Sequence, residues 1–238
     1  PNQLRTVADV TLMNGVVVSE GGKGKLCMAC HKSRRDGPVY AKTFHTRHNP
    51  HGNPQTDMLV GTNAVEYGKP IRKSSHLYAA ENACATCHMQ TVAAKYSDGT
   101  NNRAFTHVGG HTYKMKWDGG TASDPADDVE MTEACANCHG PVESFDLPKE
   151  DYDGDGKVEG VQTEVEGLLT TLAMALPPDG PTIAVTNTFT EKQLQAAYNH
   201  SFVVNDGSMG IHNTQYAVGI LRASITDVTG TMFQSFLE

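Results

Sequence analysis

The feature that most constrains this chain is a five-residue unit, Cys-x-x-Cys-His, that occurs three times in 238 residues. Two cysteines at this spacing, followed at once by a histidine, are typical of covalent haem c attachment. Each thiol forms a thioether with one vinyl group of the porphyrin, and the adjacent histidine binds the iron from one side. The three units contain all six cysteines of the chain, namely Cys27, Cys30, Cys84, Cys87, Cys135 and Cys138.

Other uses of paired cysteines explain this pattern less well. A single Cys-x-x-Cys is also found in redox-active dithiols and in halves of zinc sites, and disulfides do not select this spacing. Neither explanation accounts for the immediate histidine in all three units, or for the absence of a spare cysteine. The sequence therefore predicts three haem c groups, with His31, His88 and His139 as the proximal ligands of the irons.

Eight further histidines are available for the opposite side of the three irons. His111 follows two glycines, which allow the backbone to approach a flat ring closely. His212 stands at the start of a predicted helix, and His76 shortly precedes the second attachment unit. His48 and His51 flank Pro50 in a predicted turn. The candidate distal ligands are therefore His48, His51, His76, His111 and His212, whereas His45, His107 and His200 are interpreted as structural or exposed side chains.

Methionine is the other common axial ligand of haem iron. Met89, Met115 and Met209 lie near the attachment units or candidate ligands, but methionine is also an ordinary filler of protein cores. Histidine is favoured by its number and its placement. Ligation by two histidines implies low reduction potentials and no open coordination position on the iron.

Composition and charge limit the partners of the chain. Hydrophobic residues make up 38% of the sequence, which is low for a globular chain of this size, and haem macrocycles would supply the missing apolar bulk. The net charge of −8 argues against a nucleic-acid partner. No apolar run reaches about 18 residues, so no membrane span is predicted. Because haem attachment to this motif takes place outside the bacterial cytoplasm, we expect a periplasmic or extracellular protein whose leader has been removed before Pro1.

The pattern of apolar and turn-forming residues predicts a mainly α-helical protein with extensive coil, few or no strands, and a fold organised by its haems. We expect one unit over residues 1–238, with coil around the first haem in 1–60, the second and third haems in 61–145, and an acidic loop and C-terminal helices in 146–238. Apolar periodicity and capping residues predict helices at 124–138, 157–176 and 190–203, and a last helix after Asn213.

An acidic stretch precedes the second of these predicted helices. Residues 151–157 are Asp-Tyr-Asp-Gly-Asp-Gly-Lys, which matches the first half of a calcium-binding EF-hand loop. The glutamate usual at position 12 is replaced by Gln162, and Glu159 or Glu164 are alternatives for it. A solvated acidic turn at a helix N-terminus is the competing interpretation. Calcium is thus a second candidate cofactor, with Asp151, Asp153, Asp155, Lys157 and Gln162 as candidate residues of its site.

The chain resembles a family of multihaem cytochromes. This family includes pentahaem and octahaem nitrite reductases, tetrahaem carriers and the extracellular cytochrome filaments of metal-reducing microbes. The resemblance is carried by residues 51–59, 84–89, 109–113, 151–160 and 210–213, which together extend over most of residues 27–225. It implies that His111 and His212 are distal haem ligands, and it adds weight to His51 and His76.

The chain also departs from members of that family. It lacks the Cys-x-x-Cys-Lys site typical of the pentahaem nitrite reductases, and it has fewer haem sites than those enzymes. The filament members resemble it in size but typically carry four or more haems. In such filaments a subunit can donate a distal histidine to its neighbour, and the surplus histidines here are compatible with that arrangement.

These observations favour an electron carrier without catalytic residues. Its expected partners are redox proteins or an extracellular electron acceptor, together with further copies of itself, up to a filament. One alternative is a small reductase of nitrite, hydroxylamine or a peroxide with one open haem. Another is a filament subunit in which the haems act mainly as structural staples. The reductase would need polar groups beside its open iron, for which the candidates are Arg103, His107, Tyr113 and Lys114.

Overall fold

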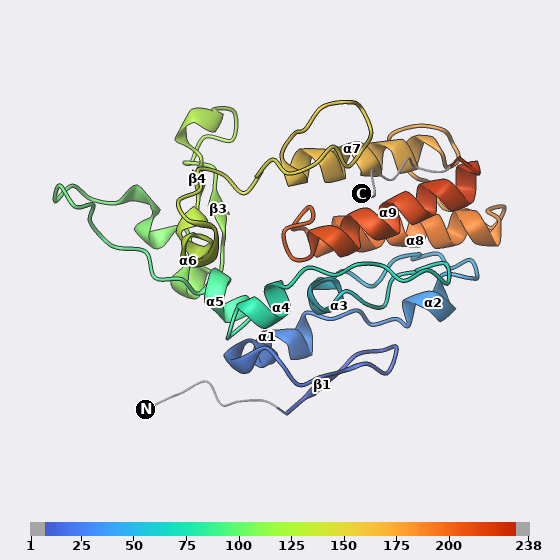
Figure 1. The fold of residues 1–238 in the computed structure, drawn as a ribbon, viewed down its shortest axis with the longest axis horizontal. Coiled ribbons are helices and arrows are strands. Elements are labelled where there is room, and N and C mark those ends of the chain that lie inside the picture. The colour runs from blue at the N-terminus through green and yellow to red at the C-terminus, as the bar shows by residue number, and fades with distance from the viewer. Residues whose placement is uncertain (1–7, 232–238) are drawn as a thin grey trace.

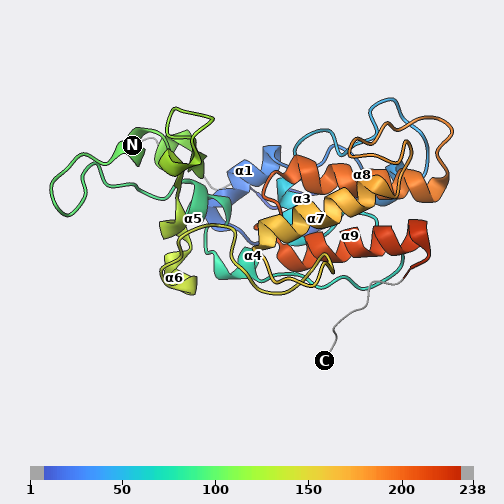
Figure 2. The same ribbon diagram turned by 90° about the horizontal axis from the view of Figure 1, so that it is seen from above.

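A computed structural model describes residues 8–231. As predicted, it is mainly helical with much coil, and its described part contains two small antiparallel sheets of two strands each (Figure 1). Three long helices near the C-terminus pack against one another at one end of the molecule. Short helices and the second sheet lie at the other end, as the two views agree (Figures 1 and 2).

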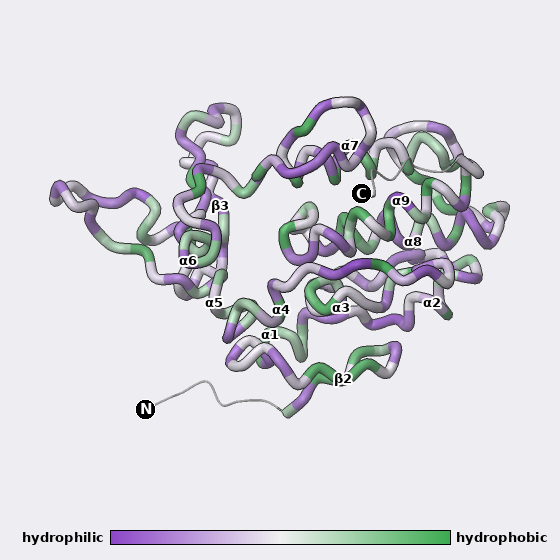
Figure 3. Tube along the Cα trace, viewed as in Figure 1, coloured by the Kyte–Doolittle hydropathy of each residue, from purple (hydrophilic) through white to green (hydrophobic). Residues whose placement is uncertain are grey.

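The N-terminal segment has more regular structure than the predicted coil. A hairpin is followed by three short helices: β1 (Val10–Thr11), β2 (Val17–Val18), α1 (Lys25–Cys30), α2 (Gly37–Tyr40) and α3 (Gln55–Val60). The strands of the hairpin are mostly apolar (Figure 3). Val10, Leu12 and Val18 are buried against Met28 and Leu59. The apolar side chains therefore give this segment a small core of its own.

The middle segment consists of short elements joined by turns. The predicted helix over 124–138 is wrong as a continuous element, because Val129–Glu130 pairs with Lys116–Trp117 in a sheet. Asp124 does cap a helical turn, since its side chain accepts a hydrogen bond from the Ala126 amide at 3.0 Å. The elements are α4 (His76–Ala79), α5 (Cys84–His88), η2 (Arg103–Thr106), η3 (Gly110–Thr112), β3 (Lys116–Trp117), η4 (Pro125–Asp127), β4 (Val129–Glu130), η5 (Thr132–Ala134) and α6 (Ala136–His139).

The C-terminal segment forms the main core. Its helices are α7 (Val161–Met174), α8 (Glu191–Asp206) and α9 (Thr214–Thr229). Thr190 and Gln193 form a capping box at the start of α8, which agrees with the helix predicted from residue 190. Asn213 caps α9 by accepting from the Tyr216 amide at 3.2 Å. Apolar side chains of all three helices pack together, among them Leu168, Leu172, Phe202, Ile220 and Leu221. Within residues 8–231, no helix is long and apolar enough to cross a membrane.

Candidate haem sites

Each attachment unit lies on a short helical turn. The second unit forms α5, the first occupies the end of α1, and the third lies on α6 and the residue before it. One helical turn brings two cysteines spaced three residues apart to the same side. The histidine follows at or just beyond the end of the turn. All six cysteines are free thiols, so each unit presents the pair that haem attachment requires.

The three units lie next to one another in chain order. Helix α1 contacts α5, and α5 contacts η5, which leads into α6. Burial raises the pKa of the Cys84 thiol to about 11, and the nearby Cys27 adds to this shift. Burial likewise raises the pKa of Cys87, with added contributions from Cys135 and Cys138. The thiols of successive units therefore lie close together, with the α5 unit between the other two.

His88 of the second unit lies opposite His212, which comes from the turn between α8 and α9. Their ring centroids are 6.2 Å apart, and their planes are inclined by 45°. Two imidazoles bound through Nε2 on opposite sides of one metal ion, each at about 2 Å, have their centroids about 6 Å apart. The separation of His88 and His212 matches this arrangement.

A second pair has the same separation. The rings of His139, in the third unit, and His76, at the start of α4, have centroids 6.1 Å apart and planes inclined by 80°. The spacing again equals the separation of about 6 Å expected of two axial ligands on one iron. Two pairs of one attachment histidine and one distant histidine therefore fit a haem iron between them.

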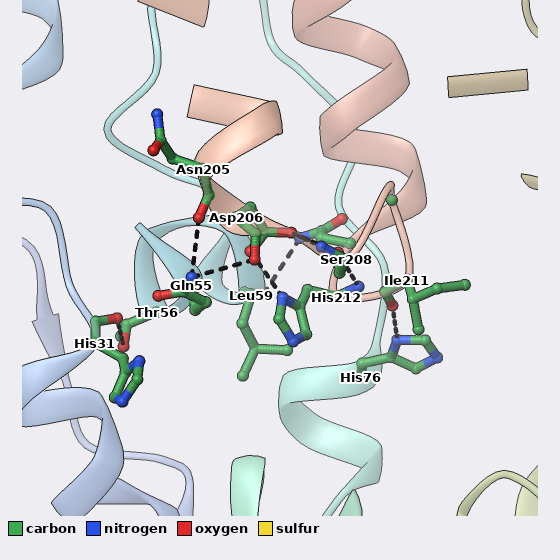
Figure 4. A network of polar contacts seen from close by, with 12 residues as sticks. His31, Gln55, Thr56, Leu59, His76, Asn205, Asp206, Ser208, Ile211 and His212 are labelled. Carbon is green, nitrogen blue, oxygen red and sulfur yellow. Dashed lines mark hydrogen bonds and ion pairs between the residues drawn. The ribbon is translucent and has the colours of Figure 1, made fainter. Parts of the chain in front are cut away.

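Hydrogen bonds at Nδ1 orient three of these four rings. His88 Nδ1 lies 2.8 Å from the Tyr113 carbonyl oxygen, and His76 Nδ1 lies 2.8 Å from that of Ile211 (Figure 4). A carbonyl only accepts hydrogen bonds, so Nδ1 carries the proton in both rings and Nε2 is left to bind metal. Burial lowers the pKa of His88, which favours the neutral form that binds metal.

His212 differs in having a carboxylate as its partner. Its Nδ1 lies 2.7 Å from Oδ1 of Asp206, the last residue of α8 (Figure 4). Burial alone would lower the pKa of His212, but the Asp206 charge and hydrogen bond outweigh burial, so the pKa is raised. Sequence reasoning missed Asp206, because a carboxylate six residues before a histidine has no recognisable spacing signal.

The turn between α8 and α9 contributes residues to both histidine pairs. It supplies His212 itself and the Ile211 carbonyl that orients His76. Gly210, at φ 94°, adopts a left-handed conformation that few other residues tolerate. The fully buried Asn213 accepts a hydrogen bond from the Ser74 amide at 2.7 Å. This bond ties the turn to the segment that carries His76.

The Gly-Gly-His segment places a main-chain carbonyl beside the second attachment unit. Gly109 has a φ of 66°, and a Cβ there would collide with the Met131 side chain and the Gln90 carbonyl. The segment thus presents the Tyr113 carbonyl to His88. His111 itself is exposed, and its ring contact is with Tyr113 at 6.4 Å. Within residues 8–231, the structure does not bring His111 together with an attachment histidine.

His31, of the first unit, has no ring contact with another histidine within the described residues. The exposed His51 lies on the neighbouring loop, in which the Pro50 carbonyl accepts from the Arg34 amide at 3.1 Å. The Thr56 amide donates to the His31 carbonyl at 2.8 Å. The loop that carries His51 therefore packs around the residues of the first unit.

The other histidines of the N-terminal half lie in the protein core or on aromatic rings. His48 is buried, and its Nε2 lies 2.8 Å from the Leu194 carbonyl oxygen, so the structure does not bring this candidate ligand to an attachment unit. His45 stacks on Tyr40 at 3.8 Å.

Two of the four polar groups considered for an open haem pack on the same aromatic ring. His107 stacks on Trp117 at 3.9 Å, and the Arg103 guanidinium lies 5.4 Å from the same ring. Tyr113 uses its carbonyl to orient His88, and Lys114 is exposed. Two of the four residues therefore pack on Trp117, and Tyr113 contacts the second unit through its carbonyl.

The acidic loop places some of the predicted residues together. Ligand oxygens of Asp151, Asp153 and Glu164 lie within 4.8 Å of one another. Asp155 instead pairs with Lys157 at 2.9 Å, and Gln162 bonds to Lys116 and to the Ser208 carbonyl. The oxygen-rich cluster therefore includes Glu164, named from the sequence only as an alternative.

Glu164 also organises the backbone of this loop. It is completely buried in the first turn of α7. Its carboxylate accepts hydrogen bonds from the amides of Tyr152 at 2.7 Å, Asp153 at 3.0 Å and Glu159 at 2.9 Å. These bonds explain why α7 begins at Val161 and not at residue 157, since the preceding residues fold back over the carboxylate.

Residues 83–165 match the family model of cytochrome c554 and c-prime. The matched segment contains the second and third attachment units and the acidic loop, and it begins after the first unit. Searches of curated proteins and of solved structures find no match. The family match supports a multihaem c-type cytochrome with covalently bound haem c and a role in haem-based electron transfer. The closer resemblance to filament subunits stays a prediction.

Proposed function

We propose that this chain is a trihaem electron carrier in which residues 1–238 act as one unit. His88 and His212 would bind one iron, His139 and His76 a second, and His31 the third. Haem c, when bound, supplies reversible one-electron chemistry. The protein contributes the attachment thiols, the axial ligands and the hydrogen bonds that orient them.

The observation that carries this proposal is the spacing of the two histidine pairs. Each pair joins an attachment histidine to one from a distant segment, at 6.2 Å and 6.1 Å. In three of the four rings Nδ1 is hydrogen-bonded, which directs Nε2 toward the metal. Other ring pairs have similar separations, such as His45 and His48 at 6.2 Å. It is therefore the attachment histidine in each pair, together with the bonded Nδ1, that supports a shared iron.

The order of the units supports a relay and not three isolated sites. The thiols of the α5 unit lie close to those of both neighbours. Haems attached to adjacent thiol pairs would lie next to each other, as electron transfer along a row requires. This proximity also weighs against haems that serve only as structural staples.

The sixth ligand of the iron in the first unit distinguishes a carrier from the alternative reductase. Since His31 faces no other histidine ring within residues 8–231, its sixth ligand would come from the exposed His51 or from a second copy of the chain. Donation by a second copy, for which the exposed His111 is available, would link subunits into an oligomer or filament. If no ligand arrives, this is the iron at which the alternative reductase of nitrite, hydroxylamine or a peroxide would act.

We place the carrier in periplasmic or extracellular respiration, where it would exchange electrons with redox proteins or with an extracellular acceptor. The family match and the covalent haem chemistry support this setting. Calcium is proposed as a structural ion of the acidic loop, held by Asp151, Asp153 and Glu164.

The test is to count the haems and determine their ligation in protein expressed with a haem-attachment system. Mass spectrometry should show three haems on each chain, and low-spin ferric spectra should account for at least two of them. Carbon monoxide then probes the third iron after reduction. Binding that disappears as protein concentration rises supports a ligand from a second copy, whereas binding at every concentration supports the reductase. Fewer than three haems would overturn the proposal.

A further inference from the structure

The four histidines of the two pairs differ in their Nδ1 partners. His88 and His76 each bond to a main-chain carbonyl oxygen. His212 alone among them bonds to a carboxylate, that of Asp206 (Figure 4). A hydrogen bond to an ionised acceptor is roughly twice as strong as one between neutral groups. The ring of His212 is therefore the most strongly polarised of the three whose Nδ1 is bonded.

The position of Asp206 is energetically unfavourable for a negative charge. Its side chain is fully buried, and it stands at the C-terminal end of α8, where the helix dipole disfavours negative charge. Among residues 8–231 no lysine or arginine pairs with it, and its ion pair is with His212. A buried carboxylate in such a place needs strong compensating contacts.

Those contacts fix both oxygens of the carboxylate. Oδ1 accepts from His212 Nδ1 at 2.7 Å. Oδ2 accepts from the Ser208 hydroxyl and, at 3.3 Å, from the Ser208 amide. The Asp206 backbone is held as well, because Gln55 Nε2 donates to its carbonyl oxygen at 3.2 Å. The side chain is thus rigidly aimed at the ring.

A carboxylate that accepts from Nδ1 raises the basicity of the ligating imidazole. A more basic ligand stabilises the ferric iron more than the ferrous iron, and this lowers the reduction potential of the haem. Carbonyl partners, such as those of His76 and His88, act in the same direction but less strongly.

We propose that Asp206 is a positioning residue that lowers the reduction potential of the haem held by His88 and His212 below that of the other two haems. This inference rests on the ligand pairs of the proposed function. The α5 unit is the middle one in the row. An electron passing through the protein would therefore cross its least favourable site in the middle and would rest on the outer haems.

The test is Asp206→Asn in the haem-loaded protein, with Asp227→Asn as the matched control. Asparagine keeps an oxygen for His212 but removes the charge. Asp227, near the end of α9, pairs with Lys192 at the start of α8, the opposite end of that helix from Asp206. Its variant also removes one negative charge but no contact to a proposed ligand. Each protein is titrated at an electrode, one electron per iron, while NMR follows the methyl groups of each haem separately.

We expect Asp206→Asn to raise the midpoint potential of the middle haem alone. Asp227→Asn should leave the midpoint potentials of all three haems unchanged. Equal shifts in the two variants, or no shift while the haem stays low-spin with two histidines, would overturn the inference but leave the proposed function intact. Should the spectra show that His212 is not a ligand, the ligand assignment itself fails. If Asp206→Asn does not fold, the midpoint potentials of the wild-type protein test the inference. A middle haem that is reduced before either neighbour would contradict it.

Discussion

His88 and His212 face each other with ring centroids 6.2 Å apart, although His88 lies in the second attachment unit and His212 in the turn before the last helix. Their separation is therefore set by the packing of the C-terminal helices against the attachment region. The buried Asn213 helps to hold this arrangement, since it caps α9 and bonds to the segment before His76.

Replacing His212 with alanine should open one coordination position. We expect the haem of the second unit to become high-spin and to bind carbon monoxide after reduction, while the haem of the third unit keeps its low-spin spectrum. The visible and electron paramagnetic resonance spectra measure this change. His107→Ala is the control, because His107 stacks on Trp117 and is not a proposed ligand. A variant of His212 with an unaltered spectrum would exclude it as a ligand.

Gly109→Ala should disturb the segment that orients His88. Both Gly109 and Gly110 have positive φ, but a Cβ at Gly109 would collide with Met131 and Gln90, whereas Gly110 has open space around it. The positive φ should cost roughly 1–2 kcal/mol in the Gly110 variant. The cost should be larger at Gly109, because its ψ of −169° places it in a region that essentially only glycine adopts, and overpacking should add about 1–3 kcal/mol there. Denaturant unfolding followed by circular dichroism compares the two. Equal losses of stability would show that the collision is relieved without cost.

Glu164→Gln should destabilise the fold. The amide group would place its NH₂ among backbone amides that now donate to the carboxylate, and each buried donor left unsatisfied costs about 1–3 kcal/mol. Glu166→Gln is the matched control on the same helix, since Glu166 is exposed, and its effect should stay within about 0.5 kcal/mol. The free energies of unfolding at constant calcium provide the comparison, and a neutral Glu164 variant would contradict the role given to this carboxylate.

Calcium should raise the thermal unfolding midpoint if the acidic loop binds it. An ion present at 100 times its dissociation constant stabilises the folded state by about 2.7 kcal/mol. Asp151→Asn should weaken this effect, because Asp151 belongs to the oxygen cluster. Asp155→Asn should preserve it, because Asp155 pairs with Lys157. Stabilisation lost equally in both variants would instead favour the EF-hand arrangement expected from the sequence.

The attachment units and the long helices were predictable because their signals are local. The capping box at Thr190 and the cap at Asn213 lie within one helical turn of the residues that they contact. The helix predicted over 124–138 failed for the opposite reason. Val129 and Glu130 pair with Lys116 and Trp117, and no pattern within 124–138 reveals a partner strand.

Local sequence patterns likewise could not predict which histidines lie opposite each other. His76 precedes the second unit in the sequence but lies opposite His139 of the third. His111, favoured by its two glycines, is exposed, whereas the neighbouring Tyr113 carbonyl contacts His88. Such relationships depend on how distant segments pack, and a main-chain carbonyl partner leaves no trace in residue identity.

The most direct test of the account is a high-resolution structure of the haem-loaded protein in its native assembly. The account predicts three haems in a row, with His88 and His212 on opposite sides of the middle iron and His76 and His139 on opposite sides of the next. An iron of the second unit that lacks His212, or haems separated beyond electron-tunnelling distance, would contradict it.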